Sequence, residues 1–142
     1  MDPNREAQLK ELSNLLIGIR KSEEPSIGRD YFEKCLLQAP VLVQGLIDSE
    51  ELKSRHEVIR SDLILLKIIR QALSNVKTLI KSGHWTEVFD EVDHIHNLPE
   101  VLWTHDDKYL KSYIDIFIPG YLRTRCRYAQ SFKLLFEELR SL

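Results

Sequence analysis

Apolar residues recur at helical spacing through the middle of the chain, over residues 56–82. One row repeats every seven positions, and neighbouring positions widen it into a broad stripe. Between Leu63 and Ile69 only Lys67 is polar, so neighbours must cover this part on more than one side. The stripe consists of Ile59, Leu65, Leu66, Ile69, Ala72, Leu73, Val76, Leu79 and Ile80. We therefore expect a long central helix over about residues 50–82.

The residues before the central helix predict two further helices. Asp2 can cap the first, because its carboxylate can accept hydrogen bonds from free backbone N–H groups and Pro3 occupies a tolerated first position. The second begins near Ser26. Pro40 lacks an N–H group and clashes with the preceding turn, so we expect a kink or restart there, with residues 41–47 as a short apolar helix. The residues expected on or beside the inner faces are Leu9, Leu12, Leu16, Ile19, Tyr31, Phe32, Cys35, Leu36 and Leu37.

Gly83 predicts the end of the central helix, because glycine can adopt the left-handed conformation of a C-cap. Thr86 is a suitable N-cap for the next helix, and Asn97 is expected to end it, since asparagine tolerates the left-handed conformation. The inward-facing residues of this helix should be Val88, Phe89, Val92 and Ile95.

The last third of the chain predicts further short helices. Pro99 suits the first turn of one that ends near Trp103. The next begins at Thr104 or Asp106 and should break at Pro119. A final helix carries Leu122, Cys126, Ala129, Phe132, Phe136 and Leu139 on one face.

Together these elements predict a single all-α domain over residues 1–142, a compact bundle of five to seven helices around the central one, with Pro40 and Pro119 as breaks. The run from Val41 to Val43 would also suit a strand, but no other segment offers a partner strand. The 142 residues, 43% hydrophobic and 30% charged, are enough for one buried core.

Charge and the N-terminal sequence limit the environment and the partners. Charged residues interrupt the central stripe too often for a membrane span. The net charge of −2 gives no general attraction to nucleic acid or anionic membrane. The first residues lack a cationic region followed by an uninterrupted apolar one, so we expect no secretory signal and a cytoplasmic location.

One stretch of about twenty residues has a familiar pattern. It reads Lys81-Ser82-Gly83-His84-Trp85, then Val88 and Val92, then Asp93-His94-Ile95-His96-Asn97-Leu98-Pro99-Glu100. This resembles small, uncharacterised, all-helical bacterial proteins in which one helix ends at glycine and the next closes on an Asp-x-aliphatic-His-Asn-aliphatic-Pro run. The resemblance implies a bacterial helical protein and no particular chemistry. Some proteins of this kind are encoded beside toxins or surface-competition systems, which implies an immunity or antitoxin role.

The same region, residues 84–107, holds four of the five histidines together with several carboxylates. Glu91 and His94 form a Glu-x-x-His arrangement, which carboxylate-bridged di-iron bundles use twice, but the sequence has no second copy. Asp90 and His94 lie one turn apart and could bind a single divalent metal, zinc or manganese, with a third ligand from elsewhere. His96 is a further candidate ligand. A small metal-dependent enzyme is therefore the alternative function.

Each of these residues also has a simpler structural explanation. His96 lies near a predicted helix end, where its ring can bind a last backbone carbonyl. Asp93 and His94 can face solvent. The two cysteines, Cys35 and Cys126, share no metal-ligand spacing and are expected to be buried, reduced thiols.

Three arginines near the C-terminus form a second candidate site, a binding patch at Arg123, Arg125 and Arg127. On a helix, Arg123 and Arg127 share a face while Arg125 points away. Such a patch suits a solvated surface or an acidic protein partner better than nucleic acid.

No Gly-rich phosphate loop, Cys-x-x-Cys pair or nucleophile elbow occurs in the sequence. We therefore expect a non-enzymatic, helical protein-binding module of an immunity, antitoxin or regulatory kind, with no cofactor. A homodimer is also considered, because a second copy could cover part of the apolar central helix.

Overall fold

The computed structural model describes residues 3–21, 29–53 and 61–124. These residues form six helices and no strand. The helices are α1 (Pro3–Arg20), α2 (Arg29–Lys53), α3 (Ser61–Lys81), α4 (Trp85–Ile95), α5 (Leu98–Thr104) and α6 (Asp107–Thr124). The predicted all-α class is confirmed, and six helices in these ranges fall within the expected five to seven.

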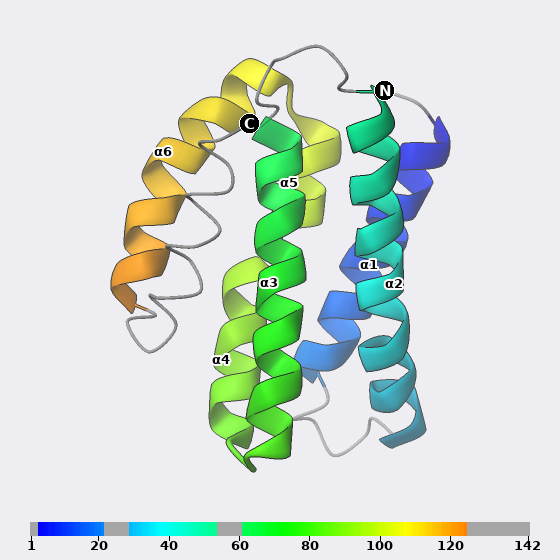
Figure 1. Ribbon diagram of the computed structural model, residues 1–142, viewed down its shortest axis with the longest axis vertical. Coiled ribbons are helices and arrows are strands. Elements are labelled where there is room, and N and C mark those ends of the chain that lie inside the picture. Colours follow the sequence, from blue (N-terminus) through cyan, green and yellow to red (C-terminus); the bar gives the residue numbers. More distant parts are fainter. Residues whose placement is uncertain (1–2, 22–28, 54–60, 125–142) are drawn as a thin grey trace.

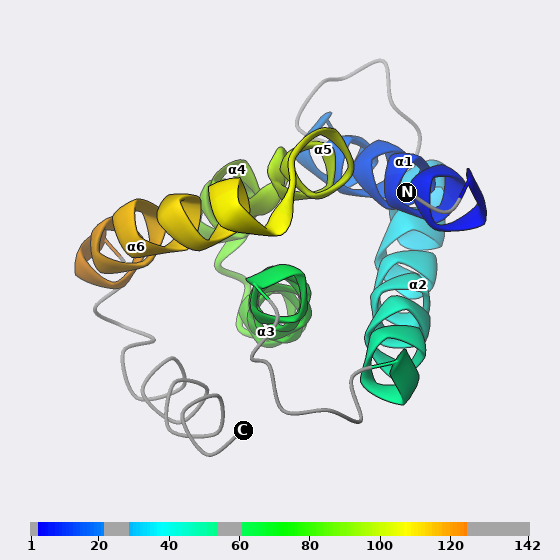
Figure 2. The ribbon, with the colours of Figure 1, turned by 90° about the horizontal axis from the view of Figure 1, so that it is seen from above.

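Helix α3 lies on the inner side of a curved layer formed by the other helices (Figure 2). Figure 2 shows α6, α4, α5, α1 and α2 as an arc with α3 on its inner side. Helix α3 packs against α2, α4, α5 and α6, while α1 packs against α2, α4 and α5. Helices α2 and α3 run nearly parallel to the long axis of the molecule, and α1 is tilted relative to them (Figure 1). The apolar stripe recognised in the sequence thus belongs to the central element of the bundle.

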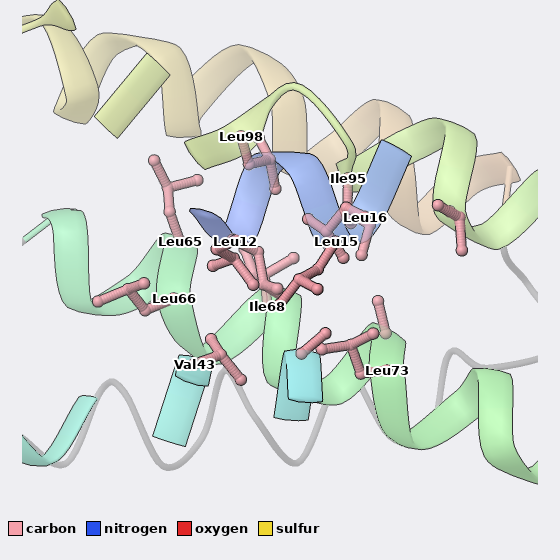
Figure 3. Close-up of a cluster of buried hydrophobic side chains, with 14 of the residues drawn as sticks. Leu12, Leu15, Leu16, Val43, Leu65, Leu66, Ile68, Leu73, Ile95 and Leu98 are labelled. Carbon is pink, nitrogen blue, oxygen red and sulfur yellow. The ribbon is translucent and has the colours of Figure 1, made fainter. Parts of the chain in front are cut away.

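The core is aliphatic. Aliphatic side chains from five helices gather in one cluster in Figure 3, including Leu12 from α1, Val43 from α2 and Leu98 from α5. Each large side chain removed from water contributes about 1.5–3 kcal/mol. Ile59 lies outside the described residues. The other predicted stripe residues that are buried are Leu65, Leu66, Ile69, Ala72, Leu73, Val76 and Leu79, with Ile80 partly buried.

Pro40 lies inside the continuous helix α2, so the restart expected at this residue is wrong, and the kink, which was its alternative, stays a prediction. A proline inside a helix costs about 3 kcal/mol. Residues on both sides of it lie on the same inward face, however, and Cys35, Ala39, Val43 and Leu46 are all buried. Their burial is worth more than the lost hydrogen bond, which keeps the chain helical through the proline.

Two other predicted boundaries were also wrong. Glu50 and Leu52 belong to the end of α2, so the central helix does not begin near residue 50. Pro119 lies within α6, whose helical backbone continues to Thr124. A proline removes one backbone hydrogen bond and can bend a helix without ending it.

The connection from α3 to α4 follows the prediction at Gly83, which has a positive φ of 75°. The Gly83 N–H donates to the Ile80 carbonyl (3.1 Å), and the His84 N–H donates to the Leu79 carbonyl (2.9 Å). These two bonds form a Schellman motif. They fold the chain back so tightly that α4 begins at Trp85 with His84 as N-cap, and the prediction of Thr86 as the cap was wrong.

Three expectations concern the helices after α4. Those for Pro99 and Asp106 are confirmed, and the left-handed conformation expected for Asn97 is not found. Pro99 lies in the first turn of α5. Asp106 accepts a hydrogen bond from the Tyr109 N–H (2.9 Å) at the start of α6, as its position predicts. Asn97 is right-handed (φ −93°), so it separates α4 from α5 without the left-handed conformation expected for it.

A buried ionic cluster joins α1, α2 and α3 at one end of the bundle. Arg5 of α1 contacts Glu50 of α2 (Nε–Oε1 2.8 Å) and Asp62 of α3 (Nη2–Oδ2 2.9 Å). Both carboxylates are nearly inaccessible to solvent. Asp62 also accepts a hydrogen bond from the Leu63 N–H (2.9 Å), which satisfies one of the free backbone N–H groups in the first turn of α3. One arginine therefore fixes three helix ends relative to each other.

We predict that Arg5→Ala destabilises the protein by about 3 kcal/mol, because it removes the cation shared by two buried carboxylates. Urea denaturation would measure the change. Arg29→Ala is the matched control, since Arg29 pairs with Glu33 (3.0 Å) on an exposed surface and should lower stability by at most about 0.5 kcal/mol. Equal effects of the two substitutions would contradict a structural role for the cluster.

Two glycines inside helices have different surroundings. A Cβ atom built at Gly18 of α1 would lie 2.5 Å from Cys35 Sγ and 2.9 Å from Tyr31 Cε1. Gly18 therefore allows α1 and α2 to approach closely. A Cβ atom at Gly45 of α2 would meet nothing within 4 Å. Packing among the described residues thus requires glycine at position 18 and does not require it at position 45.

We predict opposite effects of alanine at these two positions, measured by urea denaturation at low micromolar protein. Gly18→Ala should destabilise the protein by about 1–3 kcal/mol, because Cys35 or Tyr31 must move. Gly45→Ala should stabilise it by about 0.5–1 kcal/mol, since alanine favours helix and has room. A stable Gly18→Ala variant would show that the close contact of α1 and α2 is described incorrectly.

Candidate functional site

Helix α4 carries the predicted metal residues on different sides. Val88, Val92 and Ile95 are buried against the rest of the bundle, and Glu91 is fully buried with them. Asp90 is exposed. The two neighbouring carboxylates therefore point in different directions, as expected from the 100° that separates successive residues on a helix.

The candidate histidines contact the backbone of their own helix. His94 Nδ1 lies 2.7 Å from the Asp90 carbonyl oxygen, and His96 Nδ1 lies 2.9 Å from the Asp93 carbonyl oxygen. The second contact is the carbonyl interaction that the sequence predicts for His96 at a helix end. Asp93 also forms an ion pair with Arg20 of α1. These contacts account for each residue as part of the structure of α4.

The two remaining histidines of the segment also have local contacts. His84 Nδ1 lies 3.0 Å from Glu87 Oε2, and the His105 ring stacks on Tyr109 with centroids 3.8 Å apart. Within residues 3–21, 29–53 and 61–124, no three His, Cys, Asp or Glu side chains converge in a way that could hold a metal ion. The divalent metal and the enzyme that would use it remain predictions from the sequence.

Elemental analysis of the purified protein tests these predictions. We expect zinc, manganese and iron each far below one ion per chain, because the described residues bring no three His, Cys, Asp or Glu side chains together at a possible metal site. Stoichiometric metal that is lost in His94→Ala and retained in a Lys77→Ala control would contradict this expectation and support the enzyme.

The predicted arginine patch falls largely beyond the part of the chain that the structure describes. The backbone of Arg123 belongs to the last turn of α6. Its side chain, and Arg125 and Arg127 entirely, lie outside the described residues. The binding role of these arginines stays a prediction.

The outer face of α2 carries a feature that the sequence analysis missed. Leu37 is 72% exposed, Val41 74% and Leu52 70%. Leu37 and Val41 are one turn apart, and Leu52 returns to the same side of the helix three turns later. Leu37 was expected beside the inner face, but the buried face passes instead through Phe32, Cys35, Ala39 and Val43.

Polar side chains accompany these apolar ones and leave the face accessible. Lys34 and Asp48 are exposed along the same stripe. Gln44 donates a hydrogen bond to Asp48 (2.9 Å) and accepts one from Arg70 of α3 (3.3 Å). We call the surface formed by Lys34, Leu37, Val41, Gly45, Asp48 and Leu52 the outer face of α2.

Other exposed large side chains have ring partners within the chain or stand alone. Trp85 lies 5.8 Å from the Phe32 ring, between centroids, and Tyr109 lies between His105 and Tyr113. Ile116 of α6 is 80% exposed. Isolated exposed side chains of this kind are common on protein surfaces. The aligned side chains of α2 are a more specific signal.

Cys35 is buried beneath α1, which agrees with its expected structural role. Burial raises the pKa of its thiol, while a hydrogen bond with Tyr31 and the charge of Lys34 act in the opposite direction. A raised pKa keeps the thiol protonated near neutral pH, which does not suit a nucleophile. Cys126 lies outside the described residues.

Comparison of the chain with known protein families, with curated proteins and with solved structures gives no match. In the described ranges, no helix has both the length and the apolar character needed to cross a membrane.

Proposed function

We propose that this chain is a non-enzymatic, helical protein-binding module and that the outer face of α2 is its docking surface. The observation that carries the proposal is the exposure of Leu37 and Val41, each more than two thirds accessible, one turn apart on a helix whose opposite face is core. Burying each against a partner would contribute about 1.5–3 kcal/mol.

The geometry of this face suits an amphipathic helix as the partner. Apolar anchors spaced by one turn, with Leu52 further along, match the spacing with which one helix recognises another. Lys34 and Asp48 lie at the two ends of the apolar pair and would fix the orientation of the bound helix through charge. Polar residues around apolar anchors are also the usual arrangement of a protein interface.

The biological role within this proposal is that of an immunity, antitoxin or regulatory protein in a bacterial cytoplasm. Its support comes from the resemblance of residues 81–100 to small bacterial helical proteins. A protein of this kind works by binding another protein, which is the activity that the outer face of α2 would perform.

Photo-crosslinking in the native cells tests the docking surface. Benzoylphenylalanine at position 37 or 41 should give a defined covalent adduct, because both side chains point outward. The matched control is the same amino acid at position 116, which is equally exposed on α6. Mass spectrometry of the adduct would identify the partner.

Excess unlabelled wild-type protein should compete away the adducts from positions 37 and 41, whereas a Leu37→Glu/Val41→Glu protein should not. An adduct from position 116 alone, or none from the two α2 positions, would contradict the proposal.

A further inference from the structure

We infer that the outer face of α2 binds the same face of a second copy of this chain, as an antiparallel pair of helices whose two-fold axis passes beside Val41. The inference rests on the docking surface proposed above and names the partner of that surface. Three observations on α2 carry it: an unexplained glycine, the position of Leu37 relative to that glycine, and the charges on either side.

Gly45 has no packing role among the residues that the structure describes. A Cβ atom there would meet nothing within 4 Å, in contrast to Gly18, whose Cβ would collide with Cys35 and Tyr31. Glycine in the interior of a helix weakens it. Glycine is favoured at such a position where a neighbouring element approaches closely, as at Gly18, where side-chain atoms of α2 lie against the backbone of α1. The structure leaves room for such an approach on the outer side of α2.

The glycine lies in one row with the exposed apolar residues. Leu37, Val41 and Gly45 are spaced by four residues and form a ridge of the kind that interdigitates when two helices pack. In an antiparallel pair whose two-fold axis passes beside Val41, a residue that lies a given number of positions before Val41 in one copy faces the residue that lies the same number of positions after Val41 in the other copy. Leu37, four residues before, therefore faces Gly45, four residues after. The exposed leucine of each copy enters the notch that the glycine of the other leaves open.

The charges agree with the same register. Lys34 is seven residues before Val41 and Asp48 seven after, so they face each other across the pair, twice by symmetry. Within one chain these two residues are about 21 Å apart along the helix. Their complementarity therefore acts between copies. In a neighbouring register the two-fold axis would pass midway between Leu37 and Val41, level with position 39. Asp30 of one copy would then face Asp48 of the other, and the repulsion of these like charges disfavours that register.

The contact involves one helix from each copy. Helices that pack by rows spaced by four residues cross at about −50° and separate within about two turns of the crossing point. The interface then extends from Lys34 to Asp48, and the surface area that it buries is at the lower end of the range for specific protein interfaces. We expect a reversible dimer with a Kd of about 10–100 μM.

Sedimentation velocity of the full chain from about 5 to 500 μM tests the inference over this range. The wild-type protein should pass from monomer to dimer. Lys34→Asp places two like-charged pairs in the interface and should weaken dimerisation at least about tenfold. The double variant Lys34→Asp/Asp48→Lys should restore it to within about threefold, because the pairs are re-formed with reversed signs. Lys111→Asp, an exposed lysine on α6, is the control and should have no effect.

A second variant tests the notch. Gly45→Leu fills it and should weaken dimerisation at least about tenfold. Gly45 is exposed and a Cβ atom there meets no described atom within 4 Å, so the circular dichroism spectrum of the variant should match that of the wild-type protein.

A wild-type chain that stays monomeric throughout the range would overturn the inference, and so would a double variant as weak as Lys34→Asp. Crosslinking at positions 37 and 41 separates this failure from failure of the proposed function. Adducts with a different protein would leave the docking surface correct and the second copy wrong, whereas the absence of any adduct would contradict both.

Discussion

The structure depends on the need to bury an α3 helix that is apolar around most of its circumference. From Leu63 to Ile69 every side chain is buried or partly buried, Lys67 included. One neighbouring helix can cover only one stripe of such a surface. Helices α2, α4, α5 and α6 all pack on it, and the arc in Figure 2 is the result. The sequence suggested a homodimer because a second copy could cover the apolar central helix. Helices of the same chain cover α3 in the structure, so this reason for a homodimer no longer applies.

Helix α2 combines two tasks on opposite faces. Its inner face holds Cys35 against α1, and at its end Glu50 pairs with Arg5, which also pairs with Asp62 of α3. These contacts keep the helix continuous through Pro40 and fix its orientation. Its outer face then presents Leu37 and Val41 on a rigid support, so little conformational entropy is lost when a partner binds. The stability of the core and the accessibility of the docking surface thus come from one element.

The sequence predicted the fold class, the apolar stripes of α1, α3 and α4, and the helix end at Gly83, because each depends on local periodicity or local backbone conformation. It left open whether Pro40 kinks one helix or separates two, since the burial that offsets the cost of this proline comes from other helices. For the same reason the partnership of Arg5 with Glu50 and Asp62 was missed. Leu37 and Val41 look like core residues in sequence, and only the direction of the buried face shows that they point outward.

The central claim is that the outer face of α2 becomes buried when the protein acts. Hydroxyl-radical footprinting measures this directly by the oxidation rate of single side chains. In dilute protein, Leu37 and Ile116 should react at similar rates, since both are largely exposed. As the concentration rises through dimer formation, the account predicts that oxidation of Leu37 falls severalfold while that of Ile116 stays constant. An unchanged rate at Leu37 in a sample that sedimentation shows to be dimeric would contradict the account.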